Sequence, residues 1–374
     1  MLKKVIICLI ILLNFSFYNY AKEYNSPNII CIDRKTERVL FNKQGFEKKK
    51  IASLTKIMTA IVVVENIDLD KEIIVSKKAA LIGGSTVGIK EKDKIKVKNL
   101  LYGLLLSSGN DCAIALAEGV FGNVEDFCIK MTEKAKEIGA KNSNFITPHG
   151  LDNEMHYSTC MDMAKIMNYA MNNKEILKIM KTKEIDINFG SFNKHLRNTN
   201  RLLHKYSNIT CGKTGFTNGA NRCLVASGKN NKLEVICVTL GSQDTDIRFN
   251  ETKEVIDKCL EDYDIVDLSK QMKWYINIPI IKGEVLKYED YIKDSLTIPL
   301  TKEEREKVYI NQEFIPYLKA PIKKGKQIGV IELNIDNETL YRKDIFLNKD
   351  INKLTQKDYI NKGFKDLFNL NIYY

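Results

Sequence analysis

Apolar residues form short runs near both ends of the first 263 residues and recur at helical spacing between them. Runs such as "NIICID" and "KLEVICVTLGS" are typical of strands. Strands before and after a block of helices predict one α/β domain, with a sheet built from both ends and helices packed on it. The other predicted strands cover 37–41, 183–188, 207–214 and 221–229, and the predicted helices cover 53–67, 97–107, 110–122, 124–139, 157–173 and 246–263.

The pattern changes after Asp264. Short β-type runs then follow one another, separated by Gly, Asp and Lys turns, as in "WYINIPIIKGEV" and "KVYINQEF". No constellation of catalytic residue types occurs among them. The sequence therefore predicts a first domain over 25–263 and a small, separate all-β domain over 266–350.

The two ends of the chain have compositions of their own. Two lysines precede an apolar run from Val5 to about Phe17, and Ala21 follows, which predicts a secretory signal over 1–21. Asn19 suits a cleavage site poorly, so an uncleaved anchor is the alternative. Residues 353–374 predict an amphipathic segment that associates with an anionic membrane surface, although Gly363 weakens a helix there. A terminal helix docked on its own domain, or a frayed end, is the alternative interpretation.

The chain is basic, with a formal net charge of +11 and a pI near 9.0. Such a charge favours an anionic membrane surface or wall polymer as a neighbour, and a Lys- and Asn-rich composition bias would produce the same number. No segment resembles a nucleic-acid-binding module with interleaved aromatic residues. Nucleic acid is therefore not an expected partner.

Nine cysteines raise the question of disulfides. Cys8 would leave with the signal, and an even number of eight in an exported chain permits pairing. None forms a C-x-x-C pair, however, and most lie in apolar stretches such as "EVICVTL", which favours free core thiols. Because the four histidines form no tight cluster with the cysteines, no metal is expected.

One apolar helical stretch, "IASLTKIMTA", contains Ser53 and Lys56 three residues apart. On a helix these side chains share a face, so the lysine amine can reach the serine hydroxyl. A serine is a poor nucleophile unless a group takes its proton, and a lysine can do so where burial and nearby positive charge lower its pKa. The arrangement S-x-x-K predicts an acyl-transfer nucleophile with its base.

Two further motifs follow in the order found in penicillin-interacting enzymes. "LLSSGNDCA" places Ser108 and Asn110 at a break between two helices, and "NITCGKTGFT" places Lys213, Thr214 and Gly215 at the end of a strand. Each motif alone is weak, since "SFNK" from Ser191 also fits S-x-x-K. Three motifs in order and in suitable settings make a specific signal.

The predicted roles form one reaction without histidine or cofactor. Ser53 attacks a carbonyl, Lys56 takes its proton, and Ser108 passes a proton towards the leaving amine. Asn110 holds the substrate backbone, while Lys213 keeps the site electropositive and Lys56 neutral. The predicted substrate-binding residues are Thr214, Gly215 and Phe216. Thr214 offers its hydroxyl to a terminal carboxylate, and Gly215 lets a substrate strand approach. The Ser53 N–H is one expected oxyanion donor, and a second is expected near Phe216.

From about Asn28 to Tyr263 the chain resembles the serine D-alanyl-D-alanine carboxypeptidases, the low-molecular-weight penicillin-binding proteins. The phrases "GSTVGI", "NFITPHGLDNEMHYSTCMDMA", "RNTNRLL" and "DIRFNETKEVID" carry the likeness beside the three motifs. The resemblance implies a penicillin-binding, β-lactamase-like domain with an antiparallel sheet flanked by helices, followed by a small β domain. It also implies removal of the terminal D-alanine from peptidoglycan stems through an acyl-enzyme, with β-lactams as inhibitors.

The resemblance further implies that Arg248 helps to bind the substrate carboxylate; a helix-start arginine in a surface salt bridge is the alternative. Phe216 departs from the polar residue found there in some relatives. "HGLDNEMH" suggests zinc through His149, Asp152 and His156, but its spacing matches no standard metallopeptidase.

Three other functions share the scaffold. A class A β-lactamase would need a carboxylate that activates the deacylating water, and none is identifiable in the sequence. A transpeptidase or endopeptidase differs only in the acceptor and stays open. A non-catalytic penicillin-sensing wall protein has no reason to keep the full motif set. The expectation is an exported enzyme at the extracytoplasmic face of the membrane or wall, or secreted, which trims stems and so limits cross-linking.

Overall fold

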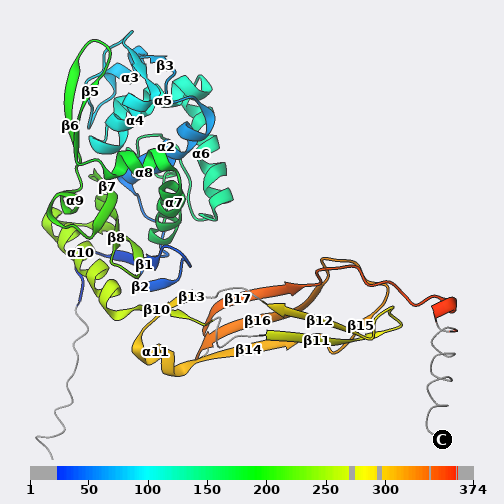
Figure 1. Ribbon diagram of the computed structural model, residues 1–374. Helices are drawn as coiled ribbons and strands as arrows, with labels where there is room; N and C mark the ends of the chain where they lie inside the picture. Colours follow the sequence, from blue (N-terminus) through cyan, green and yellow to red (C-terminus); the bar gives the residue numbers. More distant parts are fainter. Residues whose placement is uncertain (1–22, 269–273, 293–296, 337, 359, 361–374) are drawn as a thin grey trace, which may run out of the picture.

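Two domains follow one another in the computed structural model, which describes residues 23–268, 274–292, 297–336, 338–358 and 360. Figure 1 shows a rounded domain of helices around a sheet, and below it an elongated domain of long strands. The predicted signal over 1–21 and residues 361–374 of the predicted tail lie outside the described residues. No described helix combines the length and apolar character needed to cross a membrane.

An antiparallel five-stranded sheet organises the first domain. Its order is β2 (Val39–Lys43), β1 (Asn28–Asp33), β9 (Glu234–Ser242), β8 (Asn221–Lys229) and β7 (Ile209–Thr217). The two ends of the domain thus build one sheet, as predicted. Because side chains alternate along a strand, Ile29 and Cys31 of β1 pack with helix α10 (Thr245–Asp262), while Ile30 and Ile32 join the core under the other helices.

The helical block covers the other face of the sheet and carries the first two motifs, while the third lies on β7. One helix departs from the prediction over 53–67, because residues 52–55 form a 3₁₀ turn, η1 (Ala52–Thr55), before the α-helix begins at Lys56. The helices are α2 (Lys56–Asn66), α3 (Lys77–Leu81), α4 (Val97–Leu106), α5 (Asn110–Phe121), α6 (Val124–Ile138), α7 (Cys160–Asn172), α8 (Lys174–Lys181) and α9 (Arg201–Lys205).

Two small two-stranded sheets lie at the edge of this block, away from the main sheet. The strand predicted over 183–188 is present, but it pairs locally with its successor rather than with the five-stranded sheet. One pairs β3 (Glu72–Ile74) with β4 (Lys94–Lys96), with α3 in the connection between them. The other is the hairpin of β5 (Glu184–Asn188) and β6 (Asn193–Arg197).

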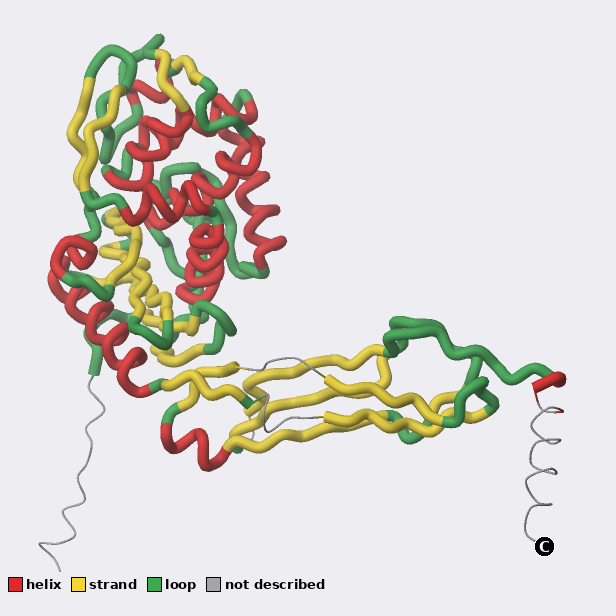
Figure 2. The backbone as a smooth tube through the Cα atoms, viewed as in Figure 1, coloured by secondary structure: helices red, strands yellow, loops and turns green. Residues whose placement is uncertain are grey.

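The second domain consists mainly of strands, and its helix α11 (Lys302–Lys307) starts at a capping box between Thr301 and Glu304. Figure 2 shows these strands running along the length of the domain. Their shared core includes Ile276, Tyr288 and Ile331. The strands are β10 (Asp264–Asp267), β11 (Trp274–Ile281), β12 (Lys287–Ile292), β13 (Thr297–Leu300), β14 (Val308–Phe314), β15 (Leu318–Lys319), β16 (Gln327–Ile335) and β17 (Glu338–Phe346).

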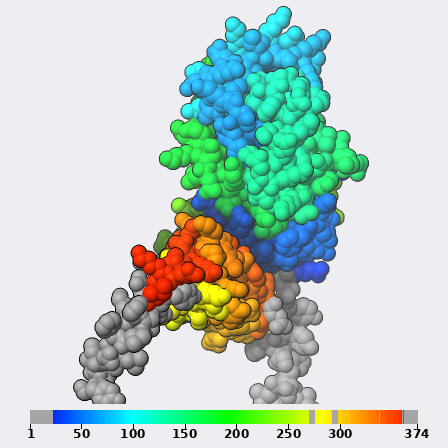
Figure 3. All heavy atoms as spheres, turned by 90° about the vertical axis from the view of Figure 1, so that its right-hand side faces the viewer, coloured from blue at the N-terminus to red at the C-terminus, as the bar shows by residue number. Residues whose placement is uncertain are grey.

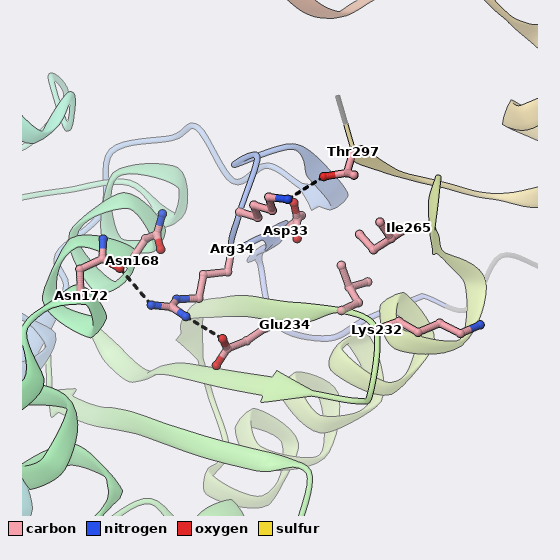
Figure 4. A pocket seen from close by; sticks show the side chains of 10 residues that line it. Asp33, Arg34, Asn168, Asn172, Lys232, Glu234, Ile265 and Thr297 are labelled. Carbon is pink, nitrogen blue, oxygen red and sulfur yellow. Dashed lines mark hydrogen bonds and ion pairs between the residues drawn. The ribbon is translucent and has the colours of Figure 1, made fainter. Parts of the chain in front are cut away.

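A polar junction joins the domains. Arg38 reaches from the first domain to Glu304, with a nitrogen–oxygen distance of 2.5 Å, and to the carbonyl of Pro299. Beside it is a cavity of about 590 Å³ (Figure 4). Arg34 in this cavity donates to Glu234 and Asn172, and Lys35 donates to Thr297. Because Thr297 belongs to the second domain and the lining residues come from both domains, the cavity is part of the joint between them.

The eight cysteines of the described chain are buried and free. Burial strongly raises the pKa of the Cys112 and Cys160 thiols, so both stay protonated. The prediction of free core thiols is confirmed, and the disulfide alternative is wrong for these residues.

Candidate active site

Ser53 and Lys56 meet at the start of α2. Lys56 Nζ lies 2.8 Å from Ser53 Oγ. The turn that presents Ser53 is tight: Ala52 has a φ of +47°, and a Cβ built on Gly150 would lie 2.0 Å from the Ala52 carbonyl oxygen. Only glycine at position 150 allows this close approach. The S-x-x-K pair is thus held by a 3₁₀ turn pressed against a distant loop.

Lys56 is completely buried. Its amine contacts two carbonyl-type oxygens besides the serine: Asn110 Oδ1 at 2.8 Å and the His149 carbonyl at 2.9 Å. Burial and, next, the charge of Lys213 lower the pKa of Lys56 well below its usual range. A buried lysine with three polar contacts and no carboxylate bonded to it favours the neutral amine.

The second motif lies between α4 and α5. Ser108 has a φ of +61°, which turns its hydroxyl towards Lys213, whose Nζ donates to Ser108 Oγ at 3.0 Å. The Asn110 side chain donates through Nδ2 to the Gly83 carbonyl at 2.7 Å, which leaves Oδ1 facing Lys56. Hydrogen bonds at both Nδ2 and Oδ1 therefore fix the orientation of the Asn110 side-chain amide.

Lys213 and Thr214 lie on β7, the edge strand of the sheet beside η1. Burial and then the Arg248 guanidinium lower the pKa of Lys213 to about 7. The hydroxyls of Thr214 and Thr199 lie 2.7 Å apart. A Cβ built on Gly215 would lie 3.1 Å from the Ser53 nitrogen, so glycine brings the strand close to the serine turn. The three predicted motifs converge on one place.

Phe216 and Arg248 lie beside this place in different environments. Phe216 is 53% exposed and stacks against the Arg222 guanidinium, 5.0 Å from its ring centroid. Arg248 is only 7% exposed and donates to the carbonyls of Gly215 and Cys223, so it braces β7 and β8. The surface salt bridge considered for Arg248 is wrong, because the side chain is buried against backbone carbonyls.

Family models match both domains. The model described as D-alanyl-D-alanine carboxypeptidase matches residues 17–244, which is more than half of the chain. The model of the penicillin-binding protein 5 C-terminal domain matches residues 266–353. The chain belongs to the D-alanyl-D-alanine carboxypeptidase family.

Individual relatives agree with this family. The D-alanyl-D-alanine carboxypeptidase DacF of Bacillus subtilis is 32% identical over 361 residues, covering 92% of each chain. The structure of penicillin-binding protein 5 from Haemophilus influenzae has a TM-score of 0.78 at 26% identity, covering 89% of this chain and 99% of that one. A mutant of the Streptomyces K15 DD-transpeptidase has a TM-score of 0.61 at 29% identity, covering 64% and 99%. The predicted family and fold are confirmed.

Sequence reasoning missed three groups that support the family site. Asp111 accepts hydrogen bonds from the backbone of Val87 and Gly88 and so anchors the "GSTVGI" loop. The His149 carbonyl binds Lys56, and Thr199 meets Thr214. Thr199 lies in the phrase "RNTNRLL" and Asp111 directly follows the second motif, so both were visible as neighbours of motifs.

The residues considered for zinc hold the fold instead. His156 accepts from the Ile146 N–H through Nδ1, and its Nε2 lies 2.8 Å from Thr55 Oγ1. Asp152 accepts from Thr217 and from the Gly219 N–H. Burial lowers the pKa of His149 to about 3 and that of His156 to about 4. The His156 imidazole joins the loop around 149–156 to the serine turn, whereas the His149 imidazole accepts a hydrogen bond from Leu151 N within that loop.

Proposed function

We propose that the chain hydrolyses the terminal D-alanine of peptidoglycan pentapeptide stems through an acyl-enzyme on Ser53. The observation that carries this proposal is the environment of Lys56. Asn110 Oδ1 and the His149 carbonyl can only accept hydrogen bonds, so they take the two N–H bonds of a neutral amine. The remaining lone pair faces Ser53 Oγ and can receive its proton.

Acylation then proceeds with Ser53 Oγ attacking the carbonyl between the two D-alanines. The Ser53 oxygen forms a bond to carbon while its proton passes to Lys56 Nζ. The backbone N–H of Ser53, and that of Phe216 on β7, are the proposed donors to the oxyanion. Gly215 keeps these two backbone segments close, since any side chain at this position would crowd the Ser53 nitrogen.

Collapse of the tetrahedral intermediate expels D-alanine, whose amine needs a proton. Ser108 Oγ, 3.0 Å from Lys213 Nζ, is the proposed donor, with Lys213 supplying the proton in turn. A pKa of about 7 allows Lys213 to carry or release a proton near neutrality. Lys56 returns its proton through Ser108 to Lys213 and becomes a base again. Water then attacks the acyl carbon while Lys56 takes a proton from it, the bond from that carbon to Ser53 Oγ breaks, and Lys56 gives the proton to Ser53 Oγ.

Substrate binding is assigned to the edge of β7. Thr214 Oγ1 and the positive charges of Lys213 and Arg248 form a site for the terminal carboxylate, and the edge strand pairs with the extended stem. Arg248 acts there through the carbonyls it braces. Phe216, half exposed, offers an aromatic surface to the neighbouring part of the stem.

A DD-transpeptidase is the second candidate, favoured by the likeness to the K15 transpeptidase over 64% of this chain. The two reactions share the acyl-enzyme and differ in whether water or an amine accepts it. The same serine would be acylated by penicillin in both. We propose that the enzyme is exported and works at the membrane or wall, next to peptidoglycan and anionic polymers, and the net charge of +11 supports this location.

The test uses protein lacking residues 1–21, a labelled penicillin and a peptide ending in D-Ala-D-Ala. Wild type should bind the label covalently and release D-alanine, and Ser53→Ala should lose both. Ser191→Ala is the matched control, because Ser191 also begins an S-x-x-K but lies in an exposed turn. Labelling with release only when an amine acceptor is added would indicate the transpeptidase. Rapid turnover of penicillin would indicate a β-lactamase, and retained activity in Ser53→Ala would exclude the proposed nucleophile.

A further inference from the structure

One loop, residues 83–89, lies directly beside the second motif. It follows helix α3 at the end of the catalytic domain that faces away from the β domain (Figure 1, Figure 3). Two of its carbonyls accept hydrogen bonds from Asn110: that of Gly83 from the side-chain Nδ2 and that of Ser85 from the backbone N–H, both at 2.7 Å. The loop therefore holds the amide whose other end, Oδ1, contacts Lys56.

The second half of the loop is held by Asp111, the residue next to Asn110. Asp111 is only 1% exposed, and burial of a carboxylate is costly unless it is hydrogen-bonded. Four backbone N–H groups donate to its two oxygens, those of Gly88 at 2.8 Å, Cys112 at 2.9 Å, Val87 at 3.0 Å and Ile89 at 3.3 Å. Two adjacent residues in the first turn of α5 thus hold both halves of the loop.

The contact between the loop and the Asn110 amide is close at Gly84. This residue has a φ of +84°, and a Cβ built on it would lie 2.7 Å from Asn110 Nδ2. Glycine therefore serves both the backbone conformation and the close approach. Any displacement of the loop towards α5 must move the amide, and with it one of the acceptors that hold the Lys56 amine.

We propose that Asp111 is a positioning residue for the reaction at Ser53. By fixing the loop 83–89 against α5, it keeps the Asn110 amide turned so that Oδ1 accepts from Lys56 and the amine lone pair faces Ser53 Oγ. A base that is misplaced by about 1 Å can lose about 10²-fold in rate. The inference rests on the proposed role of Lys56 as the base, and it assigns no contact between Asp111 and the substrate.

The charge of Asp111 also acts on Lys56. Burial lowers the pKa of Lys56 most and Lys213 on β7 lowers it further, whereas Cys112 and Asp111 on α5 raise it. Burial strongly raises the pKa of the Cys112 thiol, which stays protonated, and burial lowers that of His149, beside Lys56, to about 3. Asp111 and Lys213 are therefore opposite charges acting on one base, and removing each should move the pH profile in opposite directions.

The test measures covalent labelling by penicillin across pH, with protein lacking residues 1–21. Asp111→Asn keeps the size of the side chain but places an NH₂ group against backbone N–H donors, so the loop loses part of its anchor. The plateau of the second-order rate constant of acylation should fall about 10²-fold. Its acid limb should move to lower pH, because a charge that raises the pKa of Lys56 is gone.

Gly84→Ala tests the loop without changing any charge. The added methyl group must push the Asn110 amide aside, so the plateau should fall about tenfold. Gly122→Ala is its matched control, because Gly122 has a similar φ of +81° at the other end of α5 and a Cβ built there meets open space. It should keep the wild-type plateau and acid limb.

Asp162→Asn is the matched control for Asp111→Asn. Asp162 is also a buried carboxylate in the first turn of a helix, α7, and it accepts from Asn142 N and Ser143 Oγ. Whatever this change costs in stability, the rate and its acid limb should stay near those of wild type. Circular dichroism at pH 7 checks that each variant is folded.

The outcomes separate this inference from the proposed function. A slower plateau in Asp111→Asn and Gly84→Ala, with an acid limb at lower pH in Asp111→Asn, would support positioning. A rate like that of wild type in Asp111→Asn, or a slower rate without movement of the acid limb, would overturn it. Where Asp111→Asn does not fold, an unchanged plateau in Gly84→Ala overturns it instead. Absence of labelling in wild type would overturn the proposed function, and this inference with it.

Discussion

The catalytic site and the β domain use the same residue type in opposite ways. Lys56 and Lys213 are buried, at 0% and 1% exposure, whereas Lys282, Lys324 and Lys326 of the β domain are exposed. Burial makes the charged form of lysine costly and turns the amine into a base, while exposure keeps it a solvated cation. The comparison teaches that burial, rather than the number of positive charges, decides which lysines can take part in chemistry.

Removing the charge of Lys213 tests the buried half of this comparison and should have the largest effect. Lys213 is the second cause, after burial, of the low pKa of Lys56. Lys213→Gln should therefore raise the pKa of Lys56, so the amine stays protonated to a higher pH. We expect the acid limb of kcat/KM to move to higher pH, and activity at pH 7 to fall by about 10²-fold.

The measurement is the pH profile of D-alanine release for wild type, Lys213→Gln and Lys213→Arg. Arginine keeps the positive charge, so its acid limb should stay near that of wild type even if the rate falls. Lys282→Gln, in the β domain, should leave the profile unchanged. An acid limb that does not move in Lys213→Gln would refute the electrostatic link between the two buried lysines.

The sequence revealed the pairs that lie close along the chain, because a spacing of three on a helical turn fixes their distance. It could not reveal the contact between Lys56 and Asn110, which are 54 residues apart and meet only after α2 and α5 pack. Arg248 shows the same limit: its position at a helix start left a surface salt bridge open as the alternative, but the sheet edge covers the side chain.

The contact of Asp111 with the loop 83–89 was hidden from sequence reasoning for the same physical reason. Asp111 and Val87 are 24 residues apart, with β4 and α4 between them, and they meet only after α4 and α5 pack. Conversely, the predicted all-β pattern succeeded because alternation is a local property of each strand.

The catalytic domain should lose more stability in acid than the β domain does. The four histidines of the chain lie between residues 149 and 204, in the catalytic domain. The pKa of His156 is lowered to about 4 by burial, so below pH 6.5 the unfolded state binds a proton that the folded state does not. Stability is therefore lost as pH falls from 6.5 towards 4. For His156 this loss is on the order of 3 kcal/mol, and the β domain has no histidine to add to it.

Chemical denaturation at pH 7 and pH 4.5, followed by two signals, measures this difference. Circular dichroism reports mainly on the helices of the catalytic domain, and fluorescence reports on Trp274 in β11, the only tryptophan of the chain. The midpoint from circular dichroism should fall more steeply than that from fluorescence. His156→Gln should reduce the difference, and His195→Gln, which changes an exposed side chain, should not. Equal pH sensitivity of both signals would contradict the assignment to buried histidine.

The smallest expected effect concerns the junction between the two regions. Arg38, with a side chain only 8% exposed, donates to Glu304 and to the Pro299 carbonyl of the β domain, and its guanidinium lies 5.5 Å from the Tyr263 ring centroid. Arg38→Ala should loosen this junction by about 1 kcal/mol, so cleavage by chymotrypsin after Tyr263 should become about fivefold faster. Release of D-alanine from a soluble peptide should stay within twofold, because the motif residues keep their contacts.

Arg34→Ala is the matched control for this junction. Arg34 lies in the adjoining cavity, but its partners Glu234 and Asn172 belong to the catalytic domain (Figure 4). Its loss should leave cleavage after Tyr263 near the wild-type rate. Equal acceleration in both variants would mean that the domains are held by general packing at the joint. Acceleration in Arg38→Ala alone would identify one buried arginine as the link that holds the catalytic domain against the β domain.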